Sequence, residues 1–284
     1  MIERVAPLAA LAIALAAVPA AAQDNPPPPA EPRNDSFATI GVGIATVPDY
    51  EGSDDNRIAP FPAAMGQVSG YRFTLIGNRL SVDLIRNRPG PGWDLQLGPV
   101  AAVNFNRSST KSIDDPRIKA LGKVDTAIEL GGYAGIARTG VITSDYDRLS
   151  VSVTYRHDVA GSHDSGIWTP TVSYMTPLSR KAMVGLFASA DHVEGKYART
   201  YFSVTPGQSI ASGLPVYNAR GGWKNLTLGA MAGVSLTGDL THGLSLVGGG
   251  AWSRLMNDFA DSPVTSVAGD RNQWIGTVGL AYTF

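Results

Sequence analysis

The sequence has no cysteine, four histidines and little charge: charged residues make up 17% of its 284 residues, and the formal net charge is −1. The lack of cysteine excludes disulfides. Together with 32 glycines, it fits a β-rich protein that passes through an oxidising compartment without thiols. The near-zero net charge gives no reason to expect nucleic acid as a partner. A mean hydropathy near zero disfavours a helical membrane protein, yet it suits a barrel whose strands alternate apolar and polar residues.

Residues 1–22 have the pattern of a secretory signal peptide. Arg4 supplies a positive end, 8–18 an apolar stretch and 20–22 a small-residue cleavage site. The apolar stretch is shorter than the roughly 20 residues of a membrane anchor, and no cysteine follows it to carry a lipid. We therefore expect the mature chain to begin at Gln23.

Residues 23–35 form a proline-rich segment with consecutive prolines at 26–29. Such a segment is stiff and extended, and it cannot join a sheet. We interpret it as a periplasmic tail before the first strand; the alternative is a docking peptide for a periplasmic partner.

From residue 36 onward, the sequence repeats segments of alternating apolar and polar residues, each followed by a turn. Carboxylates fall on the face opposite the apolar residues, as a water-filled or salt-bridged lumen requires. The alternation predicts about twelve strands, at 36–47, 57–68, 70–77, 79–87, 92–105, 123–138, 146–159, 166–176, 181–194, 223–237, 242–255 and 272–284. We therefore predict an all-β fold over 36–284, a transmembrane antiparallel β-barrel. Its candidate lumen-lining residues are Asp83, Asp94, Asp125, Glu129, Arg156 and Asp191.

The last segment, 272–284, has one apolar face with aromatic residues at both ends and one face of small or polar residues. Its ending resembles the signal that outer-membrane assembly machinery reads on barrel proteins. In that pattern Thr277 is the polar position, Gly279 the glycine, and Tyr282 and Phe284 the two hydrophobic positions. The alternative is an edge strand of a soluble sandwich, where an exposed apolar face would be an aggregation hazard.

The connections between the expected strands alternate in length. Nearly all long ones fall on one side and short ones on the other, the asymmetry of bacterial barrels. An even number of strands then brings both ends of the barrel domain to the periplasm, and the long loops face outward.

Two long outer loops carry helix signals. Asp115-Pro116 reads as an N-cap and first helical residue. In loop 195–222, Thr205 and Gln208 have the spacing of a capping box. The same loop carries aromatic residues at Tyr201, Phe202 and Tyr217. We expect it to pack across or into the barrel mouth and restrict passage; the alternative is a surface turn with ordinary capping.

Four stretches resemble the MipA/OmpV family of outer-membrane proteins: 47–55, 114–122, 200–215 and 261–264. The resemblance covers nearly all of the chain after the tail. It implies a β-barrel in the outer membrane of a Gram-negative bacterium. Some members of the family are described as scaffolds between a lytic transglycosylase and a peptidoglycan synthase, and others as adhesins or stress-responsive proteins.

Three functions are therefore open. A scaffold would hold cell-wall enzymes, with outer-membrane lipid, lipopolysaccharide and the assembly machinery as its other partners. A narrow or gated channel would use the lumenal charges, unless these form an internal salt-bridge network. Catalysis is disfavoured, because no G-x-S-x-G elbow accompanies the histidines at 157, 163, 192 and 242. We expect no cofactor and no metal site. The acidic loop of Asp49, Glu51, Asp54 and Asp55 is read as solvated charge rather than a cation site, because it lacks EF-hand spacing.

Overall fold

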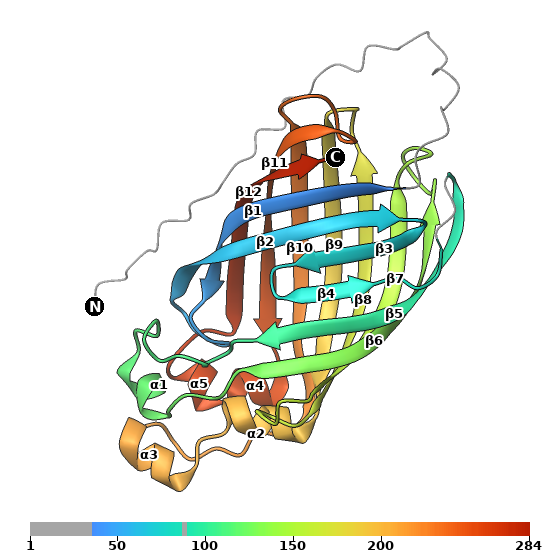
Figure 1. The fold of residues 1–284 in the computed structure, drawn as a ribbon. Coiled ribbons are helices and arrows are strands. Elements are labelled where there is room, and N and C mark those ends of the chain that lie inside the picture. Colours follow the sequence, from blue (N-terminus) through green and yellow to red (C-terminus); the bar gives the residue numbers. More distant parts are fainter. Residues whose placement is uncertain (1–35, 87–89) are drawn as a thin grey trace. The chain divides into compact units, whose positions relative to one another are not determined.

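The computed structural model describes residues 36–86 and 90–284. The expected signal peptide at 1–22 and tail at 23–35 lie outside the described residues. The described chain forms one closed antiparallel barrel in which each strand pairs with its neighbours in sequence and β12 closes on β1 (Figure 1). Its strands are β1 (Phe37–Pro48), β2 (Asn56–Val68), β3 (Tyr71–Ile76), β4 (Arg79–Val82), β5 (Gly92–Asn104), β6 (Ala127–Thr139), β7 (Arg148–Asp158), β8 (Gly166–Pro177), β9 (Ala182–Val193), β10 (Gly222–Ser235), β11 (Gly243–Leu255) and β12 (Asn272–Thr283).

The predicted fold class, an antiparallel barrel of about twelve strands, is confirmed. Most strand ends lie within two residues of their predicted positions. The largest differences are at β4, which ends at Val82 rather than 87, and at β6, which begins at Ala127 rather than 123. After β4 the strand pairing becomes irregular, and the Asp83 carboxylate accepts the backbone N–H groups of Ile85 and Leu97. A side chain there replaces a strand partner.

The outside of the barrel is apolar and the inside is small or polar. On β12, Val278 and Leu280 point outward and are half exposed, whereas Ala281 and Thr283 are buried inside. Aromatic residues lie outward near both ends of the wall: Tyr155, Trp168, Trp223, Trp252 and Trp274 at one end, and Tyr71, Trp93, Tyr174, Tyr282 and Phe284 at the other. An apolar band between two aromatic girdles is the exterior of a membrane-spanning barrel.

Small residues let the strands around the closure point approach closely. A Cβ atom added to Gly43 of β1 would lie 2.9 Å from the Cα atom of Gly279 on β12. On the inner face of β11 and β12, glycine, alanine, serine and threonine predominate. Most of the lumenal charges therefore lie on the wall from β3 to β10.

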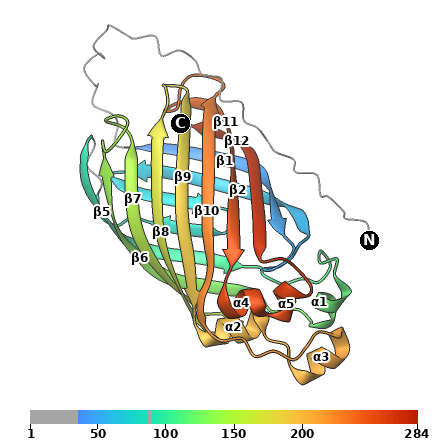
Figure 2. The same cartoon turned by 180° about the vertical axis from the view of Figure 1, so that it is seen from behind.

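Five short helices gather at one end of the barrel, which we call the cap end (Figures 1 and 2). They are α1 (Pro116–Ala120), α2 (Gly195–Phe202), α3 (Pro206–Ser212), α4 (Asn257–Asp261) and α5 (Pro263–Ser266). The opposite end has the shorter connections, and we call it the turn end. None of the helices in the described part of the chain is long and apolar enough to cross a membrane.

One irregular part of the wall lies next to β2. Strand β3 pairs with β2 only from Ala63 to Val68, so 56–61 has no strand on that side within the described residues. The carbonyl of Pro62 accepts the N–H of Gly77. Because N–H and C=O groups two residues apart point the same way along a strand, the nitrogen of Pro60 also faces the open edge. Proline has no N–H to leave unpaired, and this limits the cost of the open edge.

Candidate functional site: the helical cap and the charge network beneath it

The helical cap consists of connections 49–55, 105–126, 194–221 and 256–271 at the cap end. Two apolar clusters hold it together. One cluster joins α2 and α4 to the strand ends and contains Ile167, Val193, Tyr197, Ala198, Tyr201, Phe202, Ala219, Leu255, Phe259 and Ala260. The other joins α1 and α5 and contains Tyr50, Ile113, Ile118, Leu121, Val204, Leu214, Val264 and Ala268. Tyr217 packs against both clusters, so the cap is one packed unit.

Helix α2 turns its aromatic face toward the barrel. Positions 197, 198, 201 and 202 lie on one side of the helix, and all four are buried. The rings of Phe202 and Phe259 meet edge to face at 5.1 Å between centroids. Burying an aromatic side chain of this size contributes about 2 to 3 kcal/mol, so α2 is firmly anchored.

Glu51 lies over the lumen and connects nearly opposite sides of the barrel. Its carboxylate accepts hydrogen bonds from Lys224 Nζ at 2.6 Å, from Tyr197 Oη at 2.7 Å and from Asn106 Nδ2 at 3.3 Å. Asn106 follows β5 and Lys224 belongs to β10, five strands apart around the barrel. The loop after β1 therefore crosses the cap end of the lumen.

Lys224 is the centre of the network. Its side chain is 5% exposed, and its Nζ lies 3.5 Å from Asp191 Oδ2 as well as 2.6 Å from Glu51. Its position coincides with a register shift between Trp223 and Asn225, which lets consecutive residues of β10 face inward. Burial and the carboxylate of Glu51 raise the pKa of the Tyr197 hydroxyl well above its usual range, so Tyr197 acts as a neutral donor to Glu51.

A second part of the network surrounds Glu129 on β6. Its carboxylate contacts Arg156 Nη1 at 3.0 Å and accepts a hydrogen bond from Asn104 Nδ2 at 3.1 Å. The ring of His163 is fully buried, with Nε2 at 3.5 Å from Glu129 Oε1. It packs against the ring of Tyr197 at 5.0 Å between centroids. Glu129, Arg156 and His163 are thus held in place by contacts with one another and with Tyr197 of α2.

Arg107 fastens the cap to the wall. It follows β5 and donates through Nη2 to the carbonyl of Thr200 at 2.9 Å and through Nη1 to that of Tyr201 at 3.1 Å. Burial lowers the pKa of its guanidinium to about 10, so it remains charged at neutral pH. It binds the carboxyl end of α2, where the helix dipole favours a cation.

The candidate lumenal residues fall into three groups. Glu129, Arg156 and Asp191 lie in the network just described. Asp94 pairs with Arg148 at 2.5 Å nearer the turn end, and Asp83 is buried against the backbone. The prediction for Asp125 is wrong: its side chain is 84% exposed, in the loop before β6, with Lys123 at 3.7 Å. The sequence pattern misplaced it because alternation was extended four residues beyond the start of the strand.

The residues predicted in loop 195–222 form two groups, one packed inside the cap and one at α3. Tyr201 and Phe202 are buried, and Tyr217 is partly buried with its hydroxyl donating to the carbonyl of Asp258 at 3.1 Å. Thr205 and Gln208 form the capping box of α3. Helix α3 buries no residue, and Gln208 Nε2 donates to the carbonyl of Leu121 at 3.0 Å. Thus α3 lies against the α1 loop, while α2 covers the lumen.

Of the four residues predicted to form the assembly signal, three lie on β12, which closes the barrel, and Phe284 follows directly after it. Thr277 is opposite Ala45, Gly279 opposite Gly43 and Tyr282 opposite Ile40, all on β1. The N–H of Phe284 donates to the carbonyl of Ala38 at 2.9 Å.

Sequence reasoning missed Tyr197, Arg107 and Lys224, and read Glu51 as solvated charge. Lys224 had a weak signal, because a cation inside an otherwise alternating strand must face the lumen. The contact between Glu51 and Lys224 had none, since they are 173 residues apart.

A closed barrel with an apolar exterior, two aromatic girdles and charges confined to its interior and ends is a transmembrane β-barrel of the outer-membrane type. The chain belongs to the MipA family: the family model described as "MltA-interacting protein MipA" matches residues 40–284. A comparison with curated protein sequences gives no match to this chain.

A comparison with solved structures gives matches to several outer-membrane proteins. An anion-selective porin from Comamonas acidovorans is 12% identical, with 88% of this chain and 98% of that chain covered and a TM-score of 0.35. An outer membrane channel from Pseudomonas putida F1 is 12% identical, with 90% and 100% covered and a TM-score of 0.37. The Pseudomonas putida toluene transporter TodX is 9% identical, with 88% and 89% covered and a TM-score of 0.34. Similarity at this level carries no argument about function.

Proposed function

We propose that this protein is a non-catalytic outer-membrane scaffold that holds a lytic transglycosylase, and with it a peptidoglycan synthase, beneath the membrane. The observation that supports the structural role is the position of Glu51, whose carboxylate is paired across the cap end of the lumen under a packed helical cap. A barrel built to conduct would keep that path open. The family description supports the nature of the first partner.

The docking surface in this proposal is the turn end, which faces the periplasm. One element of this end is the β6–β7 connection at 140–147, which hydrogen bonds to Asp147 hold together. The Asp147 carboxylate accepts the N–H of Val141 at 2.6 Å and the hydroxyl of Tyr174 at 2.7 Å. The N–H groups of Ile142 and Thr143 also donate to this carboxylate. Burial alone would raise the pKa of Asp147, but the four hydrogen bonds together hold it well below its usual range.

This rigid connection presents two exposed apolar side chains, Ile142 at 70% and Tyr146 at 67% exposure. An aromatic and an aliphatic anchor on an ordered loop are suited to protein recognition, because little side-chain and backbone freedom is lost on binding. Leu178 and Leu236 are also exposed in neighbouring turns. Together they give the turn end an apolar docking surface.

The test is binding of a purified soluble lytic transglycosylase to the barrel in detergent micelles, measured by biolayer interferometry. The double variant Ile142→Ala/Tyr146→Ala should raise Kd at least about tenfold, as expected for loss of hot-spot side chains. Ile210→Ala is the control, because Ile210 is an exposed apolar residue on α3 at the cap end. A chain beginning at residue 36 separates docking by the proline-rich tail from docking by the turns. Equal binding by the control and the double variant contradicts the turn surface, and no binding by any form contradicts the scaffold.

A gated channel is the second candidate. The observation in its favour is that Asp191 keeps 21% exposure inside the barrel, so the lumen beside it has room for water. Passage would require α2 and the Glu51 loop to move. Planar-bilayer recordings of the purified barrel test this, since an intact cap should give little or no conductance and a channel should open in discrete steps.

A further inference from the structure

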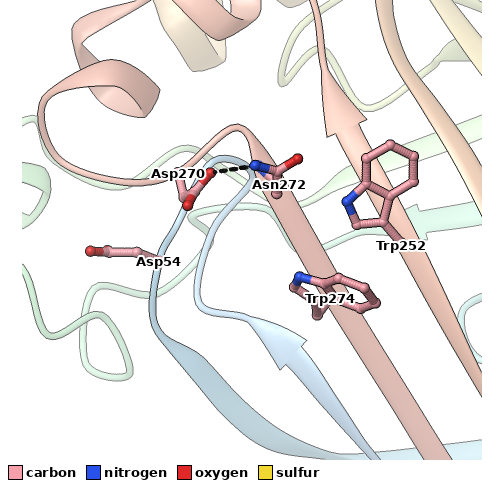
Figure 3. A pocket seen from close by; sticks show the side chains of 5 residues that line it. All are labelled: Asp54, Trp252, Asp270, Asn272 and Trp274. Carbon is pink, nitrogen blue, oxygen red and sulfur yellow. Dashed lines mark hydrogen bonds between the residues drawn. The ribbon is translucent and has the colours of Figure 1, made fainter. Parts of the chain in front are cut away.

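A pocket lies on the outside of the barrel at the cap end, away from the charge network. It has a volume of about 440 Å³ and is lined by Asp54, Trp252, Asp270, Asn272 and Trp274 (Figure 3). Asp54 belongs to the loop between β1 and β2, Trp252 to β11, and the other three to the start of β12 and the loop before it. Neither the closure of the lumen nor the proposed turn surface uses these residues.

The apolar side of the pocket is a pair of indole rings. Trp252 and Trp274 stand directly opposite each other in the β11–β12 register, so both point outward from the wall. Trp274 is 64% exposed. Two neighbouring indoles on a sheet form an open platform rather than a cage, and such a platform can stack against the C–H face of a flat apolar or amphipathic ring.

The polar side carries two carboxylates and an amide. Asp270 Oδ1 accepts the backbone N–H of Asn272 at 2.7 Å and its side-chain Nδ2 at 3.1 Å, which holds the amide beside the carboxylate (Figure 3). The N–H of Asp270 donates to the carbonyl of Gly52 at 2.9 Å, so the loop is fixed to the β1–β2 connection that also carries Asp54. These groups offer several hydrogen-bond acceptors and an amide donor at the edge of the platform.

Two arginines neighbour the pocket's residues in the register or along the chain. Arg254 stands opposite Asn272 in the register, and Arg271 lies between Asp270 and Asn272 in the chain. Two basic residues therefore accompany the acidic ones in this part of the barrel. A cationic ligand would gain little net attraction, whereas a neutral ligand with many hydroxyl groups meets both the platform and the polar edge.

We propose that this pocket binds a sugar ring, with the Trp252–Trp274 platform on its C–H face and Asp54, Asp270 and Asn272 on its hydroxyl groups. Trp252 and Trp274 belong to the aromatic girdle, so the pocket lies at the depth of lipid headgroups. The sugar is then either part of a glycolipid headgroup in the membrane or part of a soluble oligosaccharide.

The experiment uses the folded barrel in a polyoxyethylene detergent, which carries no sugar. Isothermal titration calorimetry measures binding of two probes, the soluble disaccharide of N-acetylglucosamine and purified lipopolysaccharide. The variants Trp274→Ala and Asp54→Ala should each weaken binding at least about tenfold. Trp223→Ala is the matched aromatic control, because Trp223 belongs to the same girdle and packs on His192 at 5.3 Å. Asp55→Ala is the control for loss of one loop charge.

Binding that depends on Trp274 and Asp54 but not on Trp223 and Asp55 supports the site. If the disaccharide binds in this way, the ligand includes soluble sugars; if only lipopolysaccharide does, the ligand is a glycolipid headgroup. Two outcomes overturn the proposal: no binding of either probe, or binding that all four variants retain. Equal loss in Trp223→Ala and Trp274→Ala also overturns it, because the tryptophans would then act only as membrane anchors. Gel mobility before and after heating confirms that each variant is folded.

Discussion

Lys224 and Glu51 form an ion pair with 2.6 Å between Nζ and Oε1, and this pair joins the wall of the barrel to the loop that crosses its mouth. Lys224 is almost fully buried and also faces Asp191. Because a buried cation without a partner is costly, the loop that carries Glu51 is held inward by the strand that carries Lys224.

The ion pair predicts unequal effects of its three variants. Lys224→Met leaves two carboxylates without their cation and should lower the free energy of unfolding by about 3 to 5 kcal/mol. Glu51→Gln leaves Lys224 its contact with Asp191 and should lower it by about 1 to 3 kcal/mol. The double variant should be more stable than the sum of the two losses predicts, because the residues interact directly. Urea unfolding in micelles measures all three, and additive losses would show that the two side chains are not coupled.

Helix α2, rather than α3, should control access to the lumen. Tyr197 and Tyr201 are buried against the charge network, whereas α3 has no buried residue. We expect Tyr197→Ala/Tyr201→Ala to raise single-channel conductance in planar bilayers while the barrel still assembles. Excision of 207–211 should leave conductance near that of the unchanged protein, since this part of α3 contains no buried residue. The opposite pattern would make α3 the closing element.

The cap should loosen in acid at α1. The Arg117 side chain holds the pKa of Asp115 below its usual range. Because the folded pKa lies below the unfolded value of about 4, the stabilisation is complete above about pH 4 and is lost as pH falls through the lowered folded pKa. The methyl NMR signals of Ile113 and Ile118, which are buried in the cap, should shift in this range.

Asp115→Asn tests the origin of that transition. The amide oxygen can still accept the N–H of Arg117 at the N-cap, but the charge is lost. The acid shift of the two isoleucines should therefore shrink. Asp239→Asn is the control, because Asp239 also has a lowered pKa but lies in a connection at the turn end. An undiminished shift in Asp115→Asn would assign the transition to another group.

The open edge of β2 should tolerate alanine at one proline and not at the other. The backbone N–H that Pro62→Ala creates faces Gly77, in the turn after β3. The N–H of Gly77 already donates to the carbonyl of residue 62, so the two residues are paired. Pro60→Ala places an N–H where no strand faces it within the described part of the chain. An unpaired N–H costs about 1 to 3 kcal/mol, so Pro60→Ala should lower the melting temperature or promote dimers. Melting curves and crosslinking compare the two, and equal stability would show that the edge is covered.

Loss of the final aromatic residues should impair assembly before any other property. Phe284 and Tyr282 contact each other at 4.8 Å between ring centroids, and Thr283 Oγ1 lies 2.9 Å from Thr39 Oγ1 of β1. Phe284→Ala, and more strongly removal of 282–284, should lower the amount of protein in the outer membrane. Trp93→Ala is the control, because Trp93 is an equally exposed aromatic residue of the same girdle. Normal outer-membrane levels of the truncated chain would exclude a role for the ending in assembly.

The alternation of side chains was sufficient to predict the wall of the barrel. Leu149, Val151 and Val153 alternate with serines and threonine, and this two-residue period has one structural solution when one face meets lipid and the other water. It failed at Asp125, which lies in the loop before β6, and after Val82, where the Asp83 carboxylate accepts the N–H groups of Ile85 and Leu97. The two-residue alternation of a sequence does not indicate where the backbone hydrogen bonds between neighbouring strands end.

The sequence by itself therefore determined the class of fold, the number of strands, the capping of α1 and α3, and which residues of β12 face the membrane. All of these depend on neighbours within a few positions along the chain. Only the tertiary structure decided that Glu51 reaches Lys224 and Asn106, that α2 covers the lumen while α3 does not, and that Trp252 and Trp274 share a pocket with Asp54. These contacts join segments far apart in sequence. They are fixed by barrel closure and by burial of charged groups that must find partners inside it.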